Sequence, residues 1–148
     1  MSGKQNDELI AGLNDDLAHE YAAVIQYRTY ASAVQGPYRQ ELRQFFSAEV
    51  TDELGHAQLL ADKIVALGGV PTTQAAPVKY TDDPRQMLQN SLDDEIATLE
   101  RYVARRRAAE EAGEHGLAVD LDTVIADETK HRDELRLMLG RWELSAAR

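Results

Sequence analysis

Apolar residues recur at intervals of three and four along four long segments of the chain. This spacing places them on one face of a helix that packs against a core. The pattern predicts four helices, at about residues 7–35, 38–68, 84–112 and 117–142, each on the order of 40 Å long. The residues that mark the four faces are Leu13, Leu17, Val24, Ala31 and Val34; Leu42, Phe46, Leu60, Ile64 and Leu67; Leu88, Leu92, Leu99 and Ala109; and Leu117, Leu121, Val124, Leu135 and Met138.

Glycine and proline separate these segments and indicate how they connect. Gly36-Pro37 lies between the first two helices, and Gly113 lies between the last two, so each pair is predicted to form an antiparallel hairpin. Residues 69–83 lack helical periodicity and are long enough to cross the whole bundle. We therefore expect one all-α domain over residues 1–148, a four-helix bundle of two hairpins joined by a long crossover.

The composition excludes several functional classes. The chain of 148 residues has no cysteine, so disulfides, iron–sulfur clusters, cysteine zinc sites and a thiol nucleophile are excluded. The 16 Lys+Arg and 26 Asp+Glu residues give a net charge of −10, which disfavours nucleic-acid binding and suits a protein that handles cations. No apolar run resembles a signal peptide or a membrane span. We expect a cytoplasmic protein with no nucleic-acid and no membrane partner.

Polar residues interrupt each of the four apolar faces. A carboxylate removed from water is costly unless it is paired, protonated or bound to a cation, so its place in a core register requires a reason. The interrupting residues are Glu20 and Tyr27 in the first segment, Glu49, Glu53 and His56 in the second, Glu95 and Tyr102 in the third, and Glu128 and His131 in the fourth.

An internal repeat relates the two halves of the chain. A shift of 75 positions, from Glu20 to Glu95 for example, matches the polar residues of one half with those of the other. Two hairpins packed about a pseudo-two-fold axis bring such residues together in the core, which is hard to reconcile with a coincidence of solvated charges. The shift matches Glu20 with Glu95, Tyr27 with Tyr102, Asp52 with Asp127, Glu53 with Glu128 and His56 with His131, and it also aligns Leu13, Leu17, Leu42 and Leu60 with Leu88, Leu92, Leu117 and Leu135.

Four carboxylates and two imidazoles are the ligand set of a two-metal site in a helical bundle. Each Glu-x-x-His pair lies on one helix face, so both of its side chains can bind the same site. Oxygen and nitrogen donors without thiolate favour iron or manganese, although zinc or cobalt would also bind. We assign Glu53 and Glu128 as bridging ligands, Glu20 and Glu95 as terminal ligands, and His56 and His131 as ligands of one metal each.

Other polar residues near these ligands have more than one interpretation. Asp52 and Asp127 are either acceptors for the second N–H of a ligand histidine or surface charges. Tyr27 and Tyr102 are hydrogen-bond donors to the ligands, redox-active phenols, or plain core aromatics. Glu49 is expected to be a buried ion-pair partner, with an iron site on the access route or inner surface as the alternative.

These motifs resemble those of the ferritin-like di-iron proteins, and most of all the bacterioferritins. The resemblance extends from Leu13 to about Leu139. It implies a ferritin-like bundle with a ferroxidase centre, in which dioxygen or peroxide oxidises two Fe(II) ions, and storage of ferric iron as a mineral inside a hollow assembly. It rests on Glu20, Tyr27 and Glu95, on Asp52-Glu53-Leu54-Gly55-His56, and on Asp127-Glu128-Thr129-Lys130-His131.

The chain departs from the bacterioferritin pattern in two places. The family's haem-ligand methionine corresponds to Leu54, so we do not expect haem. Few residues follow Gly140, so we expect the family's fifth helix to be absent or very short. We expect the assembly to be at least a dimer, and both a dimer and a closed cage are compatible with the sequence. Rubrerythrins share the ligand pattern, but their additional glutamate corresponds to Thr98, and their rubredoxin-type site needs cysteine.

The predicted function is a di-iron ferroxidase that oxidises Fe(II) with O2 or H2O2 for iron storage or detoxification. Two alternatives keep the same site. One is a non-caged di-metal redox enzyme, such as a rubrerythrin-like peroxidase, and the other is a bundle whose metals are only structural. For the ferroxidase, the predicted catalytic residues are Glu53, Glu128, Tyr27 and Tyr102.

Overall fold

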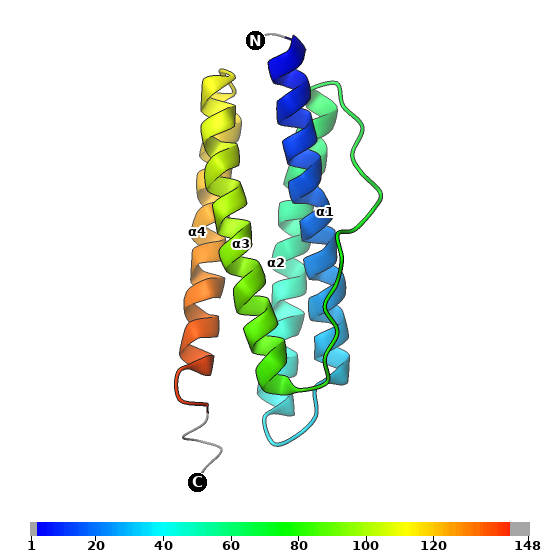
Figure 1. Cartoon of the computed structure of the whole chain (residues 1–148), viewed down its shortest axis with the longest axis vertical. Helices are drawn as coiled ribbons and strands as arrows, with labels where there is room; N and C mark the ends of the chain where they lie inside the picture. Colours follow the sequence, from blue (N-terminus) through cyan, green and yellow to red (C-terminus); the bar gives the residue numbers. More distant parts are fainter. Residues whose placement is uncertain (1–2, 143–148) are drawn as a thin grey trace.

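The computed structural model describes residues 3–142, and four helices account for most of them (Figure 1). No strand occurs within that range, which confirms the predicted all-α class. The first helix begins at Gly3 rather than near residue 7, and the last ends at Leu139 rather than near 142. The expectation about a fifth helix falls mainly on residues 143–148, outside the described part of the chain. The helices are α1 (Gly3–Ala33), α2 (Arg39–Ala66), α3 (Pro84–Glu111) and α4 (His115–Leu139).

The helices form two antiparallel hairpins that pack side by side. Helix α1 packs mainly against α2, and α3 mainly against α4, with a further contact between α1 and α3. The crossover runs along the outside of α1 for most of the bundle, so α2 and α3 point in the same direction (Figure 1). This is the predicted topology of two hairpins joined by one long connection.

Local sequence signals fix the ends of the helices. Gly68 and Gly113 end α2 and α3 with φ of +89° and +78°, a left-handed conformation that a residue with a Cβ adopts only with strain. At the start of α3, Asp83 accepts a hydrogen bond from the backbone N–H of Arg85 at 3.3 Å, and Pro84 occupies the first turn. The crossover therefore enters α3 at a defined residue.

Hydrogen bonds hold the crossover against one face of α1. The α1 positions involved are separated by four or eight residues, so they lie in one row along the helix. Their spacing explains why an aperiodic segment keeps a fixed course over the bundle. The bonds are Thr72 N–H to Asn14 Oδ1 (2.8 Å), Ala76 N–H to Ala18 O (2.9 Å), Lys79 N–H to Gln26 Oε1 (2.9 Å) and Tyr30 O–H to Lys79 O (2.6 Å).

The apolar core is divided into two clusters, one on each side of a polar layer at mid-bundle. One cluster includes Leu13, Leu60 and Leu121, and the other includes Tyr30, Phe46 and Leu135. Burial of these side chains drives the hairpins together and keeps water from both ends of the polar layer. Within residues 3–142, no helix is apolar over a length sufficient to span a membrane.

A buried ion pair joins α1 to α3 near the first cluster. Arg105 Nε donates to Oδ2 of Asp16 at 2.8 Å, and Asp16 is only 2% exposed. Burial raises the pKa of Asp16, while the hydrogen bond from Arg105 opposes that shift. Gly12 makes room for the pair, because a Cβ at this position would collide with the guanidinium of Arg105.

Two glycine substitutions test this packing. Gly55→Ala meets nothing within 4 Å on α2 and is expected to stabilise the protein by up to about 1 kcal/mol, the helix propensity difference. Gly12→Ala displaces Arg105 and leaves the buried carboxylate of Asp16 unpaired, so we expect a net loss of about 1–3 kcal/mol. Urea unfolding of both variants measures the difference. Equal stability of the two variants would contradict a structural role for the ion pair.

Candidate metal centre

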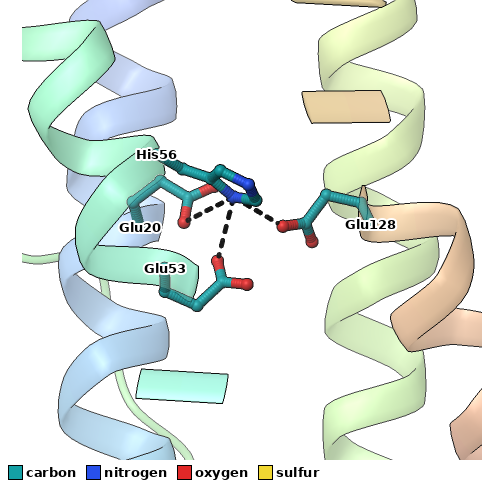
Figure 2. Close-up of side chains that lie close together, drawn as sticks. All are labelled: Glu20, Glu53, His56 and Glu128. Carbon is teal, nitrogen blue, oxygen red and sulfur yellow. Dashed lines mark ion pairs between the residues drawn. The ribbon is translucent and has the colours of Figure 1, made fainter. Parts of the chain in front are cut away.

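The polar layer at mid-bundle contains all six residues predicted to bind metal. Each helix supplies one or two of them, and their carboxylates and imidazoles point toward the bundle axis. Figure 2 shows Glu20, Glu53, His56 and Glu128 converging from α1, α2 and α4. The six are all buried, with exposed fractions of 2% for Glu20, 1% for Glu53, 6% for His56, 3% for Glu95, 0% for Glu128 and 7% for His131.

Three carboxylates surround Nδ1 of His56. Its nearest neighbour is Oε1 of Glu128 at 2.8 Å. Oxygens of Glu20 and Glu53 each lie 3.9 Å away. One donor atom from each of these four residues lies within 4.8 Å of all the others, which is a size suited to one metal ion.

Four carboxylates surround Nδ1 of His131. The oxygens of Glu53, Glu95 and Glu128 lie 3.4, 3.6 and 3.8 Å from it, and the oxygen of Glu49 lies closer, at 2.7 Å. Glu53 and Glu128 thus contact both histidines, whereas Glu20 and Glu95 each face only one. This arrangement agrees with the geometry expected of two bridging and two terminal carboxylates.

Many donor atoms of this layer lie within ion-pair distance of one another but make no well-aligned hydrogen bond. Within residues 3–142, buried atoms without a hydrogen-bond partner include Nδ1 of both histidines and oxygens of Glu20, Glu49, Glu53, Glu95 and Glu128. An orphaned polar atom in a core is costly, so such a concentration fits a layer completed by cations. The chemistry of the donors, oxygen and imidazole nitrogen without sulfur, fits two divalent metals such as iron or manganese.

Hydrogen bonds between the hairpins orient the candidate ligands. Asp127 accepts from Nε2 of His56 at 3.3 Å, and Asp52 accepts from Nε2 of His131 at 3.0 Å. Each aspartate therefore belongs to the hairpin opposite its histidine. A proton fixed on Nε2 leaves Nδ1 as the nitrogen that can bind a metal. Both aspartates are also half-exposed, so each is at the same time an acceptor for a histidine N–H and a charge at the surface.

The two tyrosines make the same kind of crossed contact. Tyr27 on α1 donates to Oε1 of Glu95 on α3 at 2.9 Å, and Tyr102 on α3 donates to Oε1 of Glu20 on α1 at 2.5 Å. Both phenols are therefore hydrogen-bond donors to glutamates that are candidate ligands, which is one of the three interpretations made from the sequence. Burial, followed by the neighbouring carboxylates, raises the pKa of both tyrosines well above the usual value.

Burial and mutual repulsion change the protonation of the carboxylates. Burial raises the pKa of Glu20 to about 8, and burial together with the charge of Glu20 raises that of Glu53 to about 8. Burial and the charge of Glu53 also raise the pKa of Glu128. For Glu95, burial acts to raise the pKa, but the neighbouring Glu128 and His131 outweigh burial and lower it.

The pKa values of the two histidines are raised, which favours the charged imidazolium form. Burial alone lowers the pKa of His56, but the adjacent carboxylates of Glu128 and Glu53 outweigh it and raise the value to about 11. The carboxylates around His131, Glu49 first among them, outweigh burial and raise its pKa as well. The metal-free layer therefore holds protons at neutral pH on its histidines and on some of its carboxylates.

A cavity of about 260 Å³ adjoins the centre between α1, α3 and the crossover. Its lining combines buried Glu20, Tyr27 and Glu53 with residues at the surface, so it reaches from the solvent side to the candidate ligands. Lys79 of the crossover and Asp94 of α3 both line it, and they form an ion pair at 2.7 Å between Nζ and Oδ1. This contact was not predictable from hydrophobic periodicity, because the crossover has no periodic pattern.

Comparisons with known proteins point to one family. The sequence pattern of the Ferritin family, described as a ferritin-like domain, matches residues 10–145. A bacterioferritin of Streptomyces coelicolor is 30% identical over 135 residues, which cover 89% of this chain and 80% of that protein. A bacterioferritin of Desulfovibrio desulfuricans is 30% identical over 143 residues, which cover 88% of this chain and 75% of that protein.

Solved structures show the same architecture. A ferritin-like diiron-carboxylate protein of Bacillus anthracis has a TM-score of 0.91 and 47% identity, covering 94% of this chain and 99% of that one. The bacterioferritin of D. desulfuricans, studied with its diiron site in different catalytic states, has a TM-score of 0.86 and 25% identity, covering 95% and 82%. The chain is a member of the ferritin-like domain family and is similar to the bacterioferritins.

Proposed function

We propose that the protein is a ferroxidase that binds two Fe(II) ions in the polar layer and oxidises them with O2 or H2O2. The observation that carries this proposal is the convergence of unpaired, buried oxygen and nitrogen donors around two histidines at mid-bundle. When bound, each Fe(II) supplies one electron, so a pair reduces H2O2 to water or O2 to H2O2, with uptake of two protons. The similarity to bacterioferritins supports iron as the metal.

The six candidate ligands divide into three roles. Glu53 and Glu128, which face both histidines, would bridge the two ions and set their separation. Glu20 and Glu95 would each bind one of the two ions as a terminal ligand, and the hydroxyls of Tyr102 and Tyr27 hold them in place. His56 and His131 would each bind one ion through Nδ1, with the ring orientation fixed by Asp127 and Asp52.

Protons held in the metal-free layer leave as metal enters. Glu20 and Glu53 have pKa values near 8 and His56 has one near 11, so these groups carry protons at neutral pH that compete with a cation. Their release offsets the positive charge that arrives in a site with low dielectric constant. The adjoining cavity would give Fe(II) and the oxidant a route to the ligands past Lys79.

We expect the function to be iron storage or detoxification by a homo-oligomer. A bundle whose metals are only structural would bind Fe(II) without fast oxidation. A small non-caged redox enzyme would oxidise Fe(II) but form no large assembly. Activity and native mass therefore separate these alternatives.

Removal of a bridging carboxylate tests the ferroxidase. Wild-type protein should bind two Fe(II) per chain anaerobically and oxidise them rapidly on addition of air or peroxide. Glu128→Ala should slow this oxidation by about a hundredfold or more, because even outer-shell partners of metal ligands contribute about 10–100-fold. Stopped-flow absorbance of the ferric product measures the rate. Glu41→Gln, an exposed change on α2, is the matched control, and an unchanged rate in Glu128→Ala would contradict the proposed site.

The pH dependence of stability tests the protonation of the empty layer. Glu20, Glu53 and His56 bind protons more tightly in the folded than in the unfolded chain, so the stability they contribute is lost as pH rises through about 8 and toward 11. The Tm of metal-free protein in EDTA should therefore fall between pH 6 and pH 9. Saturating Zn(II) should reduce this slope, since the protons are then already displaced. A Tm that rises over this range would contradict the assignment.

The native mass tests the assembly. We expect light scattering after size-exclusion chromatography to give at least a dimer. A large assembly that co-elutes with ferric mineral would support storage, whereas a stable dimer would restrict the function to oxidation and detoxification. A monomer, before and after iron loading, would contradict the proposed homo-oligomer.

A further inference from the structure

Glu49 breaks the two-fold symmetry of the metal centre. The 75-position shift that matches every other candidate ligand pairs Glu49 with Val124, an apolar residue that is 2% exposed. The side chains that contact His56 and His131 are otherwise equivalent in the two halves. The two halves therefore have different donor sets, and the difference is a single buried carboxylate.

Glu49 is the nearest carboxylate to His131. Its Oε2 lies 2.7 Å from Nδ1 of His131, closer than any oxygen of Glu53, Glu95 or Glu128. One donor atom each from Glu49, Glu53, Glu95 and His131 also lies within 4.8 Å of the others. The His131 side thus has four carboxylates, whereas the His56 side has three.

The side chain of Glu49 points into the centre, where it is the buried ion-pair partner of His131 that the sequence predicts, but the contact is not a well-aligned hydrogen bond. Glu49 is 5% exposed, and neither its Oε2 nor Nδ1 of His131 has a hydrogen-bond partner within residues 3–142. It precedes Glu53 by one helical turn, so α2 presents both carboxylates on the same face. Because Nε2 of His131 is engaged by Asp52, Nδ1 is the ring nitrogen left to bind a metal, and it faces Oε2 of Glu49.

We propose, on the basis of the two-metal function above, that Glu49 is a direct ligand of the ion on the His131 side. The two metal positions are then inequivalent. An additional carboxylate in a buried site strengthens the attraction for a cation, so the His131 position binds a divalent metal more tightly and fills first. The alternative is that Glu49 only neutralises protonated His131 and leaves when metal binds.

Anaerobic titration with Co(II) tests the proposal without turnover. Calorimetry gives the two affinities, and the visible absorption of Co(II) reports the ligands at each step. Wild-type protein should show two separate binding events. Glu49→Gln, and Glu49→Val, which copies the residue at position 124, should weaken the tighter event by about tenfold or more and alter its absorption. Glu41→Gln, an exposed change on the same helix, should change neither event.

A Co(II) affinity that does not fall when Glu49 is replaced identifies the alternative, in which Glu49 only pairs with His131. If Glu49 only pairs with protonated His131, its removal frees the imidazole, and Co(II) affinity should stay the same or rise. That result, or two equal affinities in the wild-type protein, would overturn the proposal while the two-metal site stands. Binding of fewer than two Co(II) per wild-type chain would instead contradict the proposed function. Circular dichroism confirms that each variant is folded, and the two substitutions at Glu49 must agree.

Discussion

Burial of five carboxylates around two histidines is the constraint on which this bundle depends. Elsewhere the chain shows how it neutralises a buried acid by itself, because Asp16 is paired with Arg105. At mid-bundle, the ion-pair partners found for the five glutamates within residues 3–142 are the two histidines. Two imidazoles cannot balance five carboxylates at neutral pH, so the layer either keeps protons or receives cations from solution.

The surrounding structure keeps this layer intact. The two apolar clusters lie above and below it and provide the burial that offsets its cost. The tyrosine and aspartate contacts all run from one hairpin to the other, so each hairpin orients the ligands of its partner. The crossover, held along α1 by hydrogen bonds, covers the adjoining cavity without adding a ligand. Stability and the geometry of the centre are therefore properties of the docked hairpins rather than of single helices.

Much of this arrangement was accessible from the sequence because it is periodic. Helical spacing predicted the hairpins, and the repeat predicted that Glu20, Glu53 and their counterparts would meet. The pairing of Tyr27 with Glu95 was not decidable, because it depends on the rotation of α1 relative to α3. The pair between Asp16 and Arg105 was missed, although Asp16 continues the register of Leu13 and Glu20. The position of Glu49 beside His131 also depends on packing between helices, and the repeat offers no counterpart to reveal it.

The crossed contacts relate the two halves of the chain as if they were two subunits. Tyr27 and Glu95 are matched, under the 75-position shift, by Tyr102 and Glu20, and the partners exchange places between halves. Such reciprocal contacts are the rule in an isologous dimer, where residue i of one copy contacts residue j of the other and the reverse. The chain thus has the internal symmetry of an isologous dimer whose two helical hairpins are joined covalently by the crossover. Glu49 and Val124 mark a position at which the two halves differ, so the site between them is not strictly symmetric.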